Sequence, residues 1–197
     1  MTVVLERGDI RFFYKPKVQP ADAIEVVPGV QSFFIILAPA GGGEFRRLRV
    51  GKKRMPAPTG ERFWARVERV GSLERVLRDQ LEDEHYHTKT AGDRYQPGAQ
   101  AIAAGCYAIV HHDDHDHLVY RADQFEPEVV PDEVRVPEAG SLVMLYERIP
   151  RGRAIWTTTG EPSRLDDEGA ELVLVGVDDE PERALGIDIL PGVESGL

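Results

Sequence analysis

The chain has 197 residues, 42% of them hydrophobic and 29% charged, and no run approaches the roughly 20 apolar residues of a membrane-spanning helix, so we expect a globular protein without membrane contact. The formal net charge of −10 divides unevenly: residues 1–78 carry 15 Lys or Arg against 8 Asp or Glu, and residues 79–197 carry 9 against 26. Because the acidic second part repels nucleic acid, any such contact is restricted to the first part.

Cysteine content and domain size give two further expectations. The single cysteine, Cys106, has no partner for an intramolecular disulfide, which is typical of a reducing compartment. Residues 1–9 lack the basic leader and apolar core of a secretory signal, so we expect a cytoplasmic protein. We also expect one domain over 1–197, with a weak subdivision near 90–104, where Gly, Ala, Gln and Pro predict a loop.

Short runs of aromatic and β-branched residues, bounded by Gly or Pro, predict strands along most of the chain. The runs at 10–14 and 32–37 are followed by a Gly-rich turn at 39–43 and a strand at 44–50, a pattern that predicts a hairpin. Residues 62–70 fit a helix or a strand, and we favour the strand. Further strands are predicted at 106–110, 118–122, 141–146, 154–158 and 171–177.

One helix is predicted over 72–81, with Ser72 as its N-cap and an apolar stripe on one face. A short helical turn is also predicted at 181–185, after an acidic segment. Because strands dominate and helices do not alternate with them, we expect an α+β protein that is predominantly antiparallel β, either a barrel or two packed sheets.

Residues 46–54, called the basic segment below, hold six cations within nine residues. In an extended strand alternate side chains share a face, so Arg47 and Arg49 flank Phe45 on one surface while Arg46 points to the other side. Guanidinium groups beside an aromatic ring suit phosphate contact and base stacking. The candidate anion-binding residues are Arg46, Arg47, Arg49, Lys52, Lys53 and Arg54.

The leading hypothesis is a non-enzymatic binding or regulatory module that uses the basic segment to contact nucleic acid or an acidic protein surface. One alternative is that these cations pair with acids of the same chain, since no DNA- or RNA-binding motif accompanies them. Another is a self-assembling structural protein, a homo-oligomer in which basic and acidic surfaces of different copies meet.

Four of the six histidines lie within residues 111–117. A two-residue turn at 113–114 pairs His112 with His115 and places His112, His115 and His117 on one strand face, where three imidazoles can ligate Zn²⁺, Fe²⁺ or Mn²⁺. A four-residue turn at 113–116 instead pairs His112 with His117 and leaves His115 in the loop.

The remaining histidines, His85 and His87, are spaced i, i+2 and are candidate additional ligands. A metal-dependent enzyme built on these residues would activate water, with Asp116 or Glu84 as the base. The competing interpretations are a protonation-sensitive surface cluster and an ordinary solvated turn, because a hairpin tip has no evident second shell to hold the rings.

Overall fold

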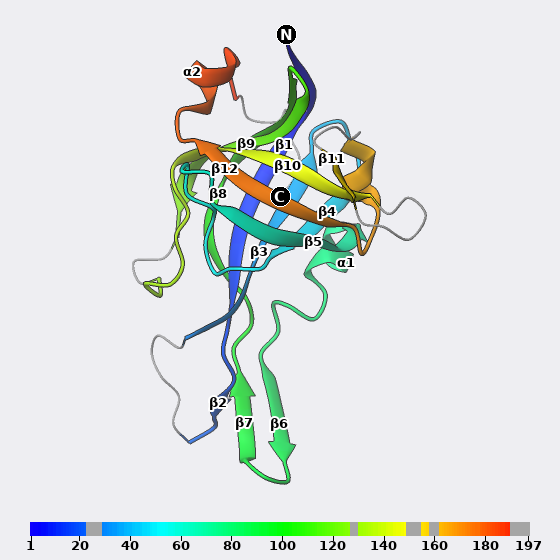
Figure 1. Cartoon of the computed structure of the whole chain (residues 1–197). Coiled ribbons are helices and arrows are strands. Elements are labelled where there is room, and N and C mark those ends of the chain that lie inside the picture. The colour runs from blue at the N-terminus through cyan, green and yellow to red at the C-terminus, as the bar shows by residue number, and fades with distance from the viewer. Residues whose placement is uncertain (23–28, 127–129, 149–154, 158–161, 190–197) are drawn as a thin grey trace.

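A computed structural model describes residues 1–22, 29–126, 130–148, 155–157 and 162–189. Eight antiparallel strands form its main body: β1 (Thr2–Pro16), β3 (Val30–Pro39), β4 (Phe45–Val50), β5 (Arg62–Gly71), β8 (Gln100–His112), β9 (His115–Phe125), β10 (Ala139–Arg148) and β12 (Glu171–Asp178). Their order is β10-β12-β5-β4-β3-β1-β8-β9, and pairing of β9 with β10 closes the sheet into a barrel (Figure 1). The predicted fold class is confirmed in its barrel form.

Strand alternation fills the barrel with side chains. On β1 and β3, Ile10 is paired with Leu37 and Phe12 with Ile35, and all four side chains are fully buried. Burial of each such side chain stabilises the fold by about 1.5–3 kcal/mol. Because the interior of the barrel is a packed core, its outer face and its ends are the places for recognition.

A short helix, α1 (Leu73–Leu77), covers part of the outer face of the barrel. The Ser72 side chain caps it by accepting a hydrogen bond from the Arg75 amide, as predicted. The helix ends four residues earlier than expected, because Arg78 is extended and Asp79 has a φ of 61°. Leu81 therefore leaves the apolar stripe and is exposed.

Three short strands form a second sheet, β2 (Gln19–Pro20), β7 (Gly92–Gln96) and β6 (Glu84–Thr88), which projects as an arm from one end of the barrel (Figure 1). The predicted loop at 90–104 is wrong, because this stretch holds β7 and the start of β8. Tertiary contacts order it: the Gln96 side chain donates to the Pro16 carbonyl, and the Tyr95 hydroxyl donates to Asp83.

The other described elements lie toward the opposite end of the barrel. The 3-10 helix η1 (Pro162–Asp166) places Leu165 in the core, and α2 (Pro181–Leu185) packs Leu185 over the outer side of β8 and β9. The predicted strand at 154–158 is present as β11 (Ile155–Thr157), and its two end positions lie outside the described residues. Within the described ranges no helix is both long enough and apolar enough to span a membrane.

Candidate anion-binding face

Arg46, at the start of the basic segment, points into the barrel and is only 4% exposed. Its Nη1 donates to Glu6 Oε1 at 2.6 Å and its Nε donates to Asp166 Oδ1 at 2.7 Å. The Tyr107 hydroxyl donates to the same Glu6 oxygen at 2.6 Å, and burial raises the pKa of Tyr107. Arg46 therefore joins β4 to β1 and η1 and has no surface to offer a partner.

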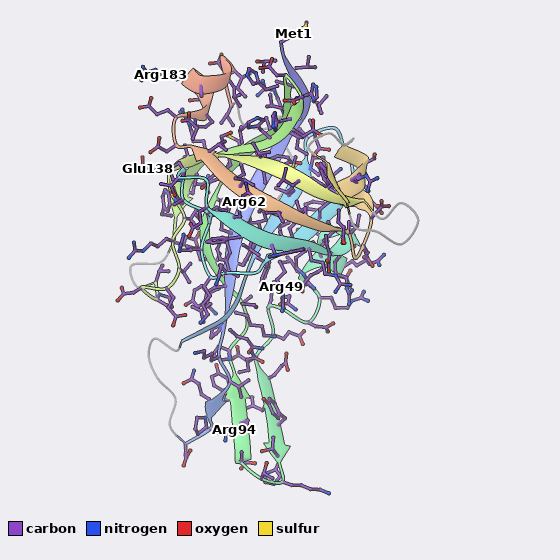
Figure 2. All side chains as sticks on the ribbon, viewed as in Figure 1. Met1, Arg49, Arg62, Arg94, Glu138 and Arg183 are labelled. Atoms are coloured by element: carbon purple, nitrogen blue, oxygen red, sulfur yellow. The ribbon has the colours of Figure 1, made fainter. Side chains whose placement is uncertain are left out.

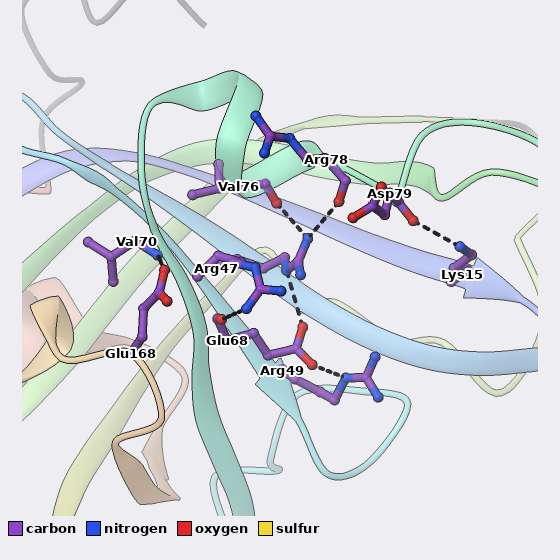
Figure 3. Close-up of polar contacts among 10 residues, drawn as sticks. Lys15, Arg47, Arg49, Glu68, Val70, Val76, Arg78, Asp79 and Glu168 are labelled. Atoms are coloured by element: carbon purple, nitrogen blue, oxygen red, sulfur yellow. Dashed lines mark hydrogen bonds and ion pairs between the residues drawn. The ribbon is translucent and has the colours of Figure 1, made fainter.

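Arg47 and Arg49 point outward and share one carboxylate, that of Glu68 (Figure 3). Arg47 Nε lies 3.1 Å from Glu68 Oε2, and Arg49 Nε lies 2.7 Å from Glu68 Oε1. Arg47 also donates to the Val76 carbonyl at 2.6 Å, and burial lowers its pKa. It therefore holds α1 on the sheet, whereas Arg49 is about half exposed.

The last cations of the basic segment are also paired with acids of the same chain. Lys53 Nζ lies 2.5 Å from a Glu133 carboxylate oxygen, and Arg54 donates two hydrogen bonds to the Glu61 carboxylate. Arg54 and the Ala57 amide lower the pKa of Glu61 to about 2. These contacts favour intramolecular pairing for most of the basic segment, although Lys52 is exposed.

The neighbouring strand carries a different set of cations on its outer face. Along β5 the alternation places Arg62, Trp64 and Arg66 outward, and the Trp64 side chain is 56% exposed. Among the described residues, Arg62 and Arg66 make no side-chain hydrogen bond or ion pair. Arg49 and Arg62 lie on the same side of the barrel in Figure 2. We call this surface the Trp64 face; it comprises Arg49, Arg62, Trp64, Arg66 and Arg69.

Register brings arginines directly opposite one another across this face. Arg49 is the partner of Arg66, and Arg47 is the partner of Arg69, on either side of a β-bulge. Like charges at opposite positions destabilise a sheet, and Glu68, which is paired with Arg47 and Arg49, opposes that repulsion. A local conflict of this kind is expected where a sequence serves binding as well as stability.

A polar pocket of about 410 Å³ adjoins the Trp64 face. Two acids, Glu68 and Glu168, limit the positive charge of the pocket. Glu168 accepts hydrogen bonds from the Val70 amide and from the Arg75 side chain. The pocket is lined by Arg47, Arg66, Val67, Glu68, Arg69, Glu168 and Gly169. The arrangement can hold an anionic group beside Arg66 and Arg69, but the two carboxylates make it a poor site for a highly charged one.

The Trp64 face was not among the predicted sites, although the alternation of residues 62–66 contains it. Those residues fit both a helix and a strand, and only the strand gathers Arg62, Trp64 and Arg66 on one side. No family model, curated protein or solved structure matches this chain.

The histidine hairpin forms in the first of the two registers considered, the one with a two-residue turn. The turn at 113–114 pairs His112 with His115 and Val110 with His117, and Asp113 takes a φ of 54°. The amino terminus binds Asp113 at 3.0 Å. The two-residue turn is confirmed, so His112, His115 and His117 share a face.

Sharing a face does not bring the three rings together as ligands. The His117 ring centroid lies 6.2 Å from that of His112 and 6.4 Å from that of His115. His117 Nδ1 is hydrogen-bonded to Ser141 at 3.0 Å, and His111 is bonded to the buried Asp116 at 2.8 Å. Among the described residues no three His, Cys, Asp or Glu groups are placed to hold a metal ion. Metal binding at this hairpin stays a prediction.

His85 and His87 lie on the arm, at the opposite end of the molecule from the histidine hairpin beside the amino terminus (Figure 1). The His85 ring packs against Tyr95, and His87 Nδ1 lies 2.7 Å from Asp93. The candidate base Glu84 is bound by Lys15. The fold therefore does not join these residues to His112, His115 and His117 in one site.

Proposed function

We propose that this chain is a cytoplasmic binding module that contacts an anionic partner through the Trp64 face. The supporting observation is that Arg62 and Arg66, both exposed and without side-chain partners among the described residues, flank an exposed tryptophan. Arg49 adds a third cation from the neighbouring strand. Arg46 and Arg47 of the basic segment are bound to groups of the same chain and stabilise the fold. In this proposal the binding surface therefore uses Arg62 and Arg66 of β5 instead.

Electrostatics favours a localised contact. The chain as a whole carries a net charge of −10, so a polyanion is repelled by most of its surface and attracted where cations gather. Exposed arginines release counterions when they neutralise a polyanion, which makes affinity fall with added salt. Binding through this face is therefore expected to be salt-dependent and confined to a few charges.

Charge reversal of Arg62→Glu with Arg66→Glu is expected to weaken binding of a fluorescent heparin fragment more than tenfold at about 50 mM salt. Because two contacts are removed, the slope of log K against log salt should fall by about two. Fluorescence anisotropy over about 50–200 mM salt measures both quantities.

The control is Lys89→Glu with Arg183→Glu, which changes the net charge equally at two exposed positions. Lys89 lies in the turn between β6 and β7 on the arm, and Arg183 lies in α2, away from the Trp64 face (Figure 2). This variant should retain the salt slope of the wild-type protein. Equal losses in the two double variants, or no loss in the Arg62/Arg66 variant, would remove the proposal.

A further inference from the structure

An exposed tryptophan surrounded by arginines combines two kinds of recognition. Trp64 is 56% exposed, although an aromatic side chain of this size usually contributes a large buried area. Indole is the best aromatic partner for cations, and it stacks well on nucleobases. The indole and the cations of this face therefore suit a ligand that has both planar rings and negative charge.

The spacing of the face matches such a ligand. Arg62 and Arg66 each lie two residues from Trp64, about 6.6–6.8 Å along the strand in opposite directions. Arg49 is directly across from Arg66 on β4. Cations thus lie along β5 on both sides of the indole and on the neighbouring strand, where they can reach groups attached to either side of a stacked ring.

We infer that the anionic partner is a single-stranded nucleic acid, with one base stacked on Trp64 and the flanking phosphates bound by Arg62, Arg66 and Arg49. This inference rests on the proposed function and specifies its ligand. Sequence-independent binding of single strands uses the same combination of base stacking and backbone charge.

A duplex fits this face less well. Its bases are already stacked on one another, and freeing one costs a few kcal/mol. Major-groove recognition needs a helix or a two-stranded ribbon that can enter the groove. β4 and β5 are neither, because β3 and β12 pair with their outer edges in the closed barrel.

The acids around the face define its extent. On the β12 side, exposed Glu171 is the cross-strand partner of Arg66, and Glu168 lines the adjoining pocket. Both repel a phosphate backbone, so the strand is expected to lie over β4 and β5. An acidic peptide would use the arginines but would gain little from the indole, which distinguishes it from a nucleic acid.

Three probes test the inference by fluorescence anisotropy: a labelled oligothymidylate of about ten nucleotides, a duplex of equal total charge, and the heparin fragment. The single strand should bind at least tenfold more tightly than the duplex. Trp64→Ala should weaken oligothymidylate binding by about 5- to 150-fold, the range expected for one stacked base, and leave heparin binding unchanged. Trp64→Phe should restore part of the loss.

The outcomes separate this inference from the proposed function. If charge reversal at Arg62 and Arg66 abolishes heparin binding, but Trp64→Ala leaves oligothymidylate binding intact, the inference is overturned and the proposed function stands. Tighter binding of the duplex, or of poly-glutamate used as a fourth probe, overturns it equally. If charge reversal changes nothing, the proposed function fails first. Circular dichroism of Trp64→Ala should match that of the wild-type protein, since the indole is not part of the core.

Discussion

Replacement of Arg46 by methionine is expected to lower the free energy of unfolding by about 3–5 kcal/mol. The substitution keeps an unbranched side chain but removes the cation that faces Glu6 and Asp166. Among the described residues, Glu6 then keeps only the Tyr107 hydroxyl as a side-chain partner, and an uncompensated charge is left in a largely buried site. Urea unfolding at neutral pH measures the loss.

The matched control is Arg49→Met, two residues along the same strand. Its ion pair with Glu68 is about half exposed on the arginine side, so the expected loss is within about 1 kcal/mol. Adding Glu6→Gln to Arg46→Met removes the unpaired carboxylate and should recover part of the stability. Similar small losses for Arg46→Met and Arg49→Met would show that the interior ion pairs do not hold β1, β4 and η1 together.

Acidification is expected to destabilise the protein through His117. This side chain is 8% exposed, and burial, helped by the nearby His112 and His115, lowers its pKa from 6.5 to about 4. The unfolded chain therefore binds a proton more readily than the folded one. Above about pH 6.5 His117 is neutral in both states and does not lower the free energy of unfolding. As the pH falls from about 6.5 to 4, the free energy of unfolding decreases by about 3 kcal/mol.

His117→Gln isolates this effect because glutamine keeps a polar group near Ser141 but does not titrate. Between pH 6.5 and about 4.5, the wild-type protein should lose stability more steeply than the variant in urea unfolding. His87→Gln, on the exposed arm, should follow the wild-type curve. Parallel curves for the wild-type protein and His117→Gln would show that His117 is not buried in its neutral form.

Local pattern predicted most of the barrel but not its details. Alternation located the strands but left two registers open for the β8–β9 hairpin, because a two-residue turn and a four-residue turn both keep the alternation of faces. The structure has the two-residue turn at 113–114. The arm was missed because Gly92 and Pro97 mark a loop, while long-range bonds to Pro16 and Asp83 order the strand between them. The helix was predicted too long because its apolar stripe continues to Leu81.

The candidate site was harder to predict because the number of cations does not reveal which of them are neutralised. Arg46 meets an acid 120 residues away, and Arg47 meets one 21 residues away. Such pairings arise from the closure of the sheet and leave no local signal. Trp64 and its flanking arginines do have a local signal, because they occupy every second position. That spacing becomes informative once residues 62–71 are known to form a strand.

The most direct measurement is a titration of the ¹⁵N-labelled protein with oligothymidylate of about ten nucleotides, followed by heteronuclear NMR. The largest shift changes are expected at Arg49, Arg62, Trp64 and Arg66, and they should include the indole N–H of Trp64. They should shrink as salt is raised from about 50 to 200 mM. Shifts that cluster instead at the histidine hairpin or on the arm would contradict the assignment of binding to the Trp64 face.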